Sequence, residues 1–274
     1  MQNVIKTVVF ILLVSLSIEA KENRFTTSVS LLGMSMDYRE YDRSGKILDS
    51  EMSSFTEMLG VDIGMSFLMY QTSDASTKLQ TNLITLSGNT DYVGSLLDDP
   101  TCSEYGCHKS RTVNNIIDFD VKIIRTKILT QALEVNYLLG LGYHYWDRQL
   151  SVSQVEGYEW YSLRAGVGLG YQISQKFKIA TDLEYQYGFK HTMTSSYPVL
   201  DVTLGSADIM KLSIPLRYTL NNKMDFIMSY IYEIQEIGAS NVQTASYKGT
   251  YRPFYEPQST AKNQYIKLGL DFKY

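Results

Sequence analysis

The stretch Ile266-Lys-Leu-Gly-Leu-Asp-Phe-Lys-Tyr274 changes character at every residue. Five apolar or aromatic side chains alternate with lysine, glycine, aspartate and lysine. Successive side chains of a β-strand point to opposite faces of the sheet. The stretch therefore predicts a strand with one apolar face and one charged face.

The same period-two alternation recurs from Phe25 onward, in segments separated alternately by short turns and longer polar stretches. Two segments are less regular, and the first changes phase at Leu31-Leu32-Gly33, where we expect a β-bulge. The pattern predicts about ten strands, and eight or twelve stay possible because a long loop could hide a hairpin. The segments span residues 25–41, 61–70, 79–92, 117–123, 133–145, 161–171, 177–190, 211–218, 225–235 and 266–274.

The composition is compatible with strands that are apolar on one side only. The mean hydropathy of −0.16 is that of a soluble domain, but a strand that shows lipid at every second residue dilutes the apolar signal in this way. The 22 tyrosines suit a membrane boundary, where the ring meets acyl chains and the hydroxyl meets water. A net charge of −4 gives no reason to expect a nucleic-acid partner. We predict a single domain, because no linker or shift in composition divides the chain.

The first twenty residues have the three parts of a secretory signal peptide. Lys6 precedes the apolar run Val8-Val-Phe-Ile-Leu-Leu-Val-Ser-Leu16, and Ile18 and Ala20 suit the positions before a cleavage site. The run is shorter than the roughly 20 residues of a membrane-spanning helix, which makes an uncleaved anchor the weaker alternative. We expect residues 1–20 to be removed and residues 21–274 to form the mature protein.

A final strand that ends on an aromatic residue, with long and short connections in alternation, resembles the bacterial outer-membrane β-barrels. The resemblance implies an all-β, closed antiparallel transmembrane barrel, an outer-membrane location, contact with lipid and lipopolysaccharide, and recognition of strand 266–274 by the barrel-assembly machinery. Closure is also expected physically, because a sheet edge in hydrocarbon would leave backbone groups without partners. The alternative is a soluble β-sandwich or lipocalin-like barrel with its apolar face inward.

In the membrane barrel the charged face lines the lumen, together with glycines that suit a crowded interior. Both signs of charge are interleaved, so we expect the side chains to pair and fill the space, since a barrel of eight to ten strands leaves little more than room for side chains. A narrow selective channel of porin-like type stays open as an alternative. The predicted lumen charges are Asp62, Asp118, Asp120, Lys122, Glu134, Arg164, Asp182, Glu184, Lys211, Arg217, Asp225, Glu233, Lys267 and Asp271.

The size, strand number and loop plan also resemble the omptin surface proteases. Omptins pair an Asp-x-Asp with an Asp-x-His across the outer cleft. Asp118-Phe-Asp120 has the first spacing, but the chain contains no Asp-x-His, and His191 lacks the carboxylate partner. The His-x-Ser pair of lipid-modifying barrels is also missing from the sequence. We keep Asp118, Asp120 and His191 as the candidates for a surface hydrolase, favour a protein without enzymatic activity, and expect no cofactor.

Two loop segments complete the sequence-based expectations. Cys102 and Cys107 lie in one polar segment of an exported chain, which favours a loop disulfide over a metal site formed with His108. The segment 238–261 is rich in the aromatic and arginine side chains that binding surfaces favour, although the same side chains could only pack the loop over the barrel mouth. The candidate binding residues are Tyr247, Tyr251, Arg252, Phe254 and Tyr255.

Overall fold

The computed structural model describes residues 24–96 and 99–274. The described residues are almost entirely β-structure, and the predicted signal peptide and its cleavage point lie outside them. Apart from the one-turn 3-10 helix at Pro100–Cys102, all the elements in these two ranges are strands. They are β1 (Phe25–Tyr41), β2 (Ile47–Met52), β3 (Met58–Gln71), β4 (Ala75–Gly94), β5 (His108–Ile128), β6 (Leu133–Gln149), β7 (Val155–Gln172), β8 (Phe177–Ser196), β9 (Val199–Thr203), β10 (Ala207–Asn221), β11 (Met224–Ile237), β12 (Gln243–Tyr247), β13 (Thr250–Phe254) and β14 (Gln258–Lys273).

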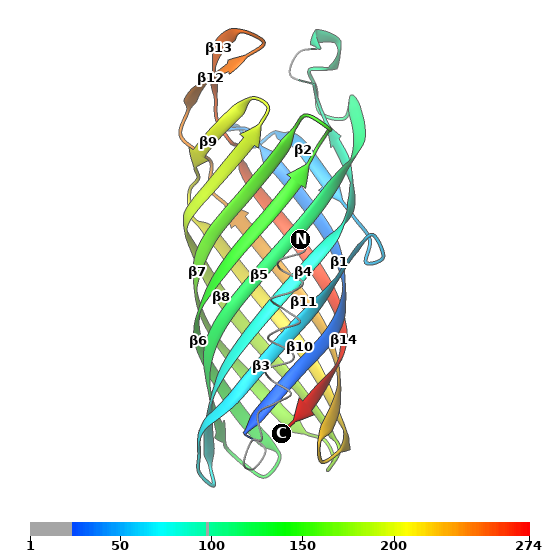
Figure 1. Ribbon diagram of the computed structural model, residues 1–274, viewed down its shortest axis with the longest axis vertical. Helices are drawn as coiled ribbons and strands as arrows, with labels where there is room; N and C mark the ends of the chain where they lie inside the picture. Colours follow the sequence, from blue (N-terminus) through cyan, green and yellow to red (C-terminus); the bar gives the residue numbers. More distant parts are fainter. Residues whose placement is uncertain (1–23, 97–98) are drawn as a thin grey trace.

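The strands form one closed antiparallel barrel of ten positions (Figure 1). Each of the ten positions pairs with its two neighbours around the ring, and β14 pairs with both β11 and β1 to close it. The short strands β12 and β13 form a separate two-stranded sheet. The last residue joins the first strand, since the backbone N–H groups of Phe25 and Tyr274 each donate to the other's carbonyl oxygen. Within the described ranges, no helix has the length and apolar character needed to cross a membrane. The predicted closed barrel of about ten strands is confirmed.

Two of the ten positions are shared by two strands each. β2 and β3 both pair with β1 and β4, and β9 and β10 both pair with β8. The segment 53–57 that separates β2 from β3 fits because its neighbours are glycines, since a Cβ on Gly33 would lie 2.6 Å from the Phe55 carbonyl oxygen. The alternation in the sequence also predicts outer loops near 42–53 and 192–207, and these are wrong in extent, because strands β2 and β9 occupy parts of them.

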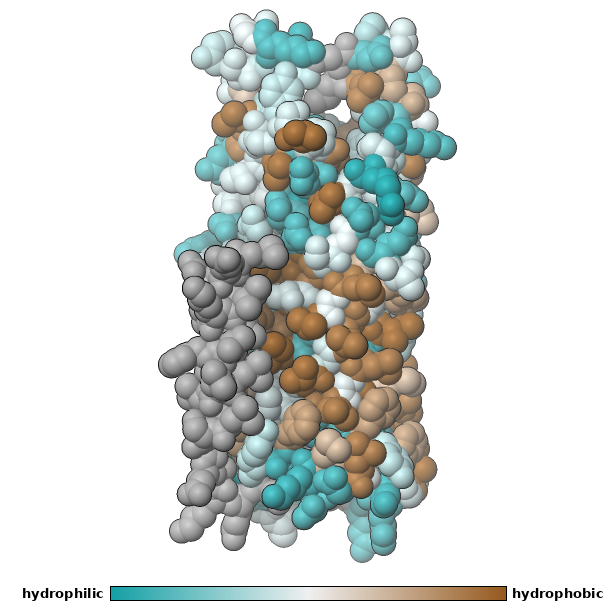
Figure 2. All heavy atoms as spheres, turned by 45° about the vertical axis from the view of Figure 1, so that its right-hand side comes forward, coloured by the Kyte–Doolittle hydropathy of each residue, from teal (hydrophilic) through white to brown (hydrophobic). Residues whose placement is uncertain are grey.

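We call the end with the short turns after β3, β5, β7 and β10 the turn end, and the opposite end, which carries β9, β12 and β13, the loop end (Figure 1). In the half near the turn end, apolar side chains point out of the barrel, as predicted. Leu139, Leu141 and Leu163 are all more than half exposed. Figure 2 shows a broad apolar zone over the lower half of the visible face, with hydrophilic residues at the turn end below it. That zone matches a surface that faces acyl chains.

The half near the loop end has the opposite polarity. Leu32, Met34, Met36 and Tyr38 of β1 are buried inside the barrel, while Asp37 and Arg39 face outward. The outer surface above the apolar zone is correspondingly more hydrophilic in Figure 2. β4, β5 and β8 each have 20 or 21 residues, about twice the 9–11 that cross a bilayer. The half near the loop end thus has the polarity of a soluble barrel, with a polar outside and its own apolar core.

This arrangement corrects two expectations from the sequence. No bulge occurs at Leu31-Leu32-Gly33, because β1 keeps an unbroken register there with both β14 and β3. The change of phase in the sequence instead marks the level at which the strand leaves the apolar zone. The expectation that apolar residues face outward along the whole barrel is wrong for the loop-end half. The buried core there comprises Leu32, Met34, Met36, Tyr38, Met58, Leu86, Ile116, Trp146, Tyr158, Trp160, Met193, Val202, Leu204, Ala207, Ile209, Ile237 and Ala261.

Aromatic side chains mark the boundary between the two halves. The rings of Tyr143 and Tyr161 lie 5.4 Å apart on neighbouring strands, and Phe189 lies 6.2 Å beyond Tyr161. All three side chains project outward. The places of Tyr143 and Tyr161 at the outer ends of their segments predict an aromatic girdle, and the structure places these two tyrosines accordingly. Tyr38 and Tyr158, which we also expected in the girdle, are instead buried in the interior core.

Candidate functional site

The interior carries three groups of paired charges, and the middle group is organised by Arg164 of β7. Its guanidinium is almost completely buried and lies 2.9 Å from the Asp118 carboxylate and 3.0 Å from that of Asp120, both on β5. Lys122 reaches Glu184 of β8 at 2.8 Å. These contacts join strands that are not neighbours in the sheet, so they cross-link the wall from the inside.

A second group lies at the turn end. Arg217 of β10 reaches Asp225 at 2.8 Å and Asp271 at 2.9 Å, and Lys273 also lies 2.8 Å from Asp225. Between the two groups, Lys267 pairs with Asp62 at 2.7 Å. The structure places the predicted lumen charges on the inner face, with Glu134 paired to Lys178 and Lys211 to Glu233. Within the described residues, Asp182 is the member of the set that forms no ion pair.

The third group, near the loop end, was not predicted from the sequence. Arg148 is buried and lies 2.6 Å from Glu51, 2.7 Å from Glu40 and 3.0 Å from Glu156. The group also includes Asp49, whose carboxylate is 3.6 Å from the guanidinium. These residues lie inside or beside the polar stretches 42–53 and 147–157, for which the sequence predicts outer loops. The sequence does contain a signal for an inward Arg148, because Arg148 lies four residues after His144 and therefore on the same face of the strand.

Polar neighbours form hydrogen bonds with most of the remaining donors and acceptors of this loop-end group. Thr90 donates a hydrogen bond to Glu51, and Asn114 donates to both of them. Tyr158 donates to Glu256 at 2.6 Å, which brings the loop before β14 over the group. Burial, together with the negative charges of Glu40 and Glu156, raises the pKa of the Glu256 carboxyl well above its usual value.

Side chains from opposite walls meet at the level of Arg148. β1 and β6 are separated by three intervening strand positions on one side of the barrel. Arg148 of β6 nevertheless contacts Glu40 of β1, and the rings of Trp146 and Tyr38 lie 5.1 Å apart in an edge-to-face arrangement. Tyr158 stacks on Trp146 at 5.0 Å. The lumen is therefore crossed by packed side chains at this level.

The residues considered for hydrolysis are engaged in structural contacts. Asp118 and Asp120 are both held by Arg164, and Asp118 lies 3.2 Å from His144. His191 is buried at the loop end of β8, where its ring packs 4.7 Å from that of Trp160. The structure thus joins the aspartates to His144, and no interaction among the described residues joins either of them to His191.

The two cysteines form the predicted disulfide, so they cannot act as thiolate ligands. In the part of the chain that the structure describes, no cluster of three or more His, Cys, Asp or Glu side chains is arranged to hold a metal ion.

The candidate binding residues between β11 and β14 lie on and beside a separate hairpin formed by β12 and β13. Tyr247 is buried against Tyr197 and Phe254, with ring centroids 5.0 and 5.9 Å away, and Arg252 lies 5.9 Å from its ring centroid. Tyr255 lies under the guanidinium of Arg43. Tyr251, at the tip, is 77% exposed. The segment therefore contains both a packed base and an exposed aromatic tip.

Solved structures share this architecture. The outer membrane protease OmpT from Escherichia coli superimposes with a TM-score of 0.62 at 9% identity, covering 94% of this chain and 99% of that one. The fold is that of a bacterial outer-membrane β-barrel. Two further barrels are more distant: the translocator domain of the autotransporter NalP from Neisseria meningitidis (TM-score 0.44, 7% identity, 99% and 96% covered) and Ail from Yersinia pestis (TM-score 0.34, 12% identity, 92% and 99% covered). At these identities the likeness concerns the fold alone, and neither a family model nor a curated protein matches the chain.

Proposed function

We propose that this protein is a non-enzymatic surface-binding barrel of the bacterial outer membrane, with its loop end outside the cell. The observation that carries the proposal is the inversion of polarity along the strands. A barrel that only spanned the membrane would need strands of about 10 residues. Here the strands continue beyond that length into the loop-end half, whose outer surface is polar. The loop-end half holds the β12–β13 hairpin and its exposed Tyr251 at a distance from the membrane.

The closed interior favours binding over transport. Arg148 and Trp146 reach across to β1, so an open water path would require buried ion pairs and a packed aromatic cluster to separate. The hydrolase alternative receives little support, because the aspartates are neutralised by Arg164 and the chain has no Asp-x-His. In this proposal, lipid and lipopolysaccharide contact the apolar zone, and the assembly machinery recognises strand 266–274.

Retention of proteoliposomes on arrays of immobilised glycans and proteins tests the proposal. We expect selective retention by the unmodified protein and a severalfold loss in Tyr251→Ser, because an exposed aromatic side chain is a typical binding anchor. Val152→Ser is the matched control, since Val152 is 98% exposed in another loop. Absence of retention on every surface, or stepwise conductance in planar bilayers, would contradict the proposal.

A further inference from the structure

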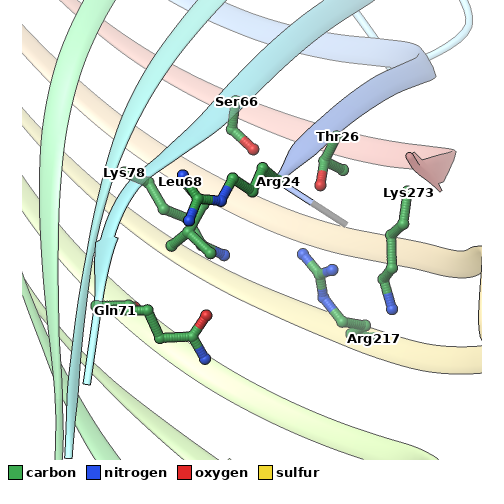
Figure 3. Close-up of a pocket in the computed structure, with 9 residues that line it drawn as sticks. Arg24, Thr26, Ser66, Leu68, Gln71, Lys78, Arg217 and Lys273 are labelled. Carbon is green, nitrogen blue, oxygen red and sulfur yellow. The ribbon is translucent and has the colours of Figure 1, made fainter. Parts of the chain in front are cut away.

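A cavity of about 270 Å³ opens at the turn end of the barrel. Four cationic side chains line it: Arg24, Lys78, Arg217 and Lys273. Figure 3 shows them around one space, with Arg24 and Lys78 on one side and Arg217 and Lys273 on the other. The remaining lining is mostly uncharged donors, namely the hydroxyls of Thr26, Ser66 and Ser76 and the amide of Gln71. No carboxylate belongs to this described lining.

The cations are only partly neutralised by neighbours outside the cavity. Asp225 pairs with both Arg217 and Lys273, and Asp271 pairs with Arg217. Within the described residues, no carboxylate forms an ion pair with Arg24 or Lys78. Four positive charges and two negative ones leave an excess of two positive charges at the cavity.

The geometry points to a binding site for a small phosphate-bearing anion that enters from the turn end. A phosphate monoester carries a charge of about −1.5 to −2 near neutral pH and three acceptor oxygens, which matches the excess charge and the surrounding donors. Guanidinium and ammonium groups form strong charge-assisted hydrogen bonds with such oxygens. A monocarboxylate would leave about half of the excess charge without a partner. The cavity lies in the lumen, and the strands separate it from the surrounding lipid. The anion is therefore a soluble one and not a lipid headgroup of the surrounding leaflet.

Isothermal titration calorimetry with inorganic phosphate and with glycerol phosphate, on the protein in a phosphate-free maltoside detergent, tests this inference. We expect saturable binding of both with one site per chain, and much weaker binding of acetate. The double variant Arg24→Gln, Lys78→Gln should weaken phosphate binding by at least about tenfold, because each lost charge-assisted bond is worth about that factor. It leaves the ion pairs of Arg217 and Lys273 intact.

The matched control is Lys176→Gln, Lys223→Gln, which removes two exposed lysines from turns at the same end of the barrel but outside the cavity. Equal loss of binding in both double variants would show diffuse surface charge and overturn the inference. So would absence of binding to the unmodified protein, or phosphate binding seen only when the protein is placed in phospholipid nanodiscs. Unchanged thermal unfolding of both variants ensures that folding does not account for the result.

Discussion

At the scale of single residues, Arg148 is the side chain on which the loop-end interior depends. It is buried and compensates the charges of Glu40, Glu51 and Glu156, which come from three different strands. An arginine can serve several carboxylates at once because its planar guanidinium presents five donors. Without it, the carboxylates would remain buried with no counter-charge.

We therefore expect Arg148→Met to lower the free energy of unfolding by about 3–5 kcal/mol, the usual cost of leaving buried charges without their partner. Urea titration in detergent, followed by tryptophan fluorescence, measures this change. The control is Arg111→Met, which removes an ion pair to Glu57 whose arginine is 58% exposed. That variant should lose less than about 1 kcal/mol. Equal unfolding midpoints for the two variants would refute the role assigned to Arg148.

At the scale of elements, one irregular residue of β8 changes which residues of the strand point into the barrel. Glu184, Gln186 and Gly188 point inward, but beyond Lys190 the inward residues are His191, Met193 and Ser195. The register with β7 shifts at this point, where Lys190 has a φ of 52°. The extra residue is a β-bulge that moves His191 into the interior core.

Because a β-branched side chain is strained at positive φ, Lys190→Val should destabilise the protein by about 1–2 kcal/mol. Lys190→Gly should leave stability unchanged or raise it. Thr194→Val, on the same strand at an exposed position in regular β conformation, is the control and should have little effect. Urea unfolding of the three variants decides the matter, and a glycine variant less stable than the valine one would argue against a strained bulge.

The sequence predicts the strands and their faces well where apolar and polar residues alternate in one phase. It predicts them less well where the phase changes, because more than one structure explains such a change. Over the predicted segments 133–145 of β6 and 266–274 of β14 the alternation keeps one phase, so the faces there are as expected. In β1 the apolar residues change parity at Leu31-Leu32, and a bulge and an inversion of the environment give the same pattern in sequence. Only the register with β14 and β3 distinguishes them. The Arg148 group was missed because its carboxylates converge from β1, β2 and β7, and alternation says nothing about which strands face each other.

At the scale of the whole molecule, the barrel consists of two parts with opposite polarity. The half near the turn end has an apolar outside and a charged inside, while the half near the loop end has a polar outside and an apolar core. The sequence raises two alternatives, a membrane barrel with apolar residues outside and a soluble barrel with apolar residues inside. The first describes the half near the turn end, and the second describes the half near the loop end. The two parts share continuous strands, so the level at which polarity changes fixes the depth of the protein in the bilayer.

The most direct measurement of this depth uses spin labels at Leu31 and Asp37, which lie on the same outer face of β1. The described residues contain no free cysteine, so single cysteines can be introduced at these positions without competing sites there. In lipid vesicles, we predict that the label at position 31 collides with oxygen dissolved in the lipid, and that the label at position 37 collides with a water-soluble nickel complex. Oxygen-dominated collisions at both positions, or nickel-dominated collisions at position 31, would contradict the account.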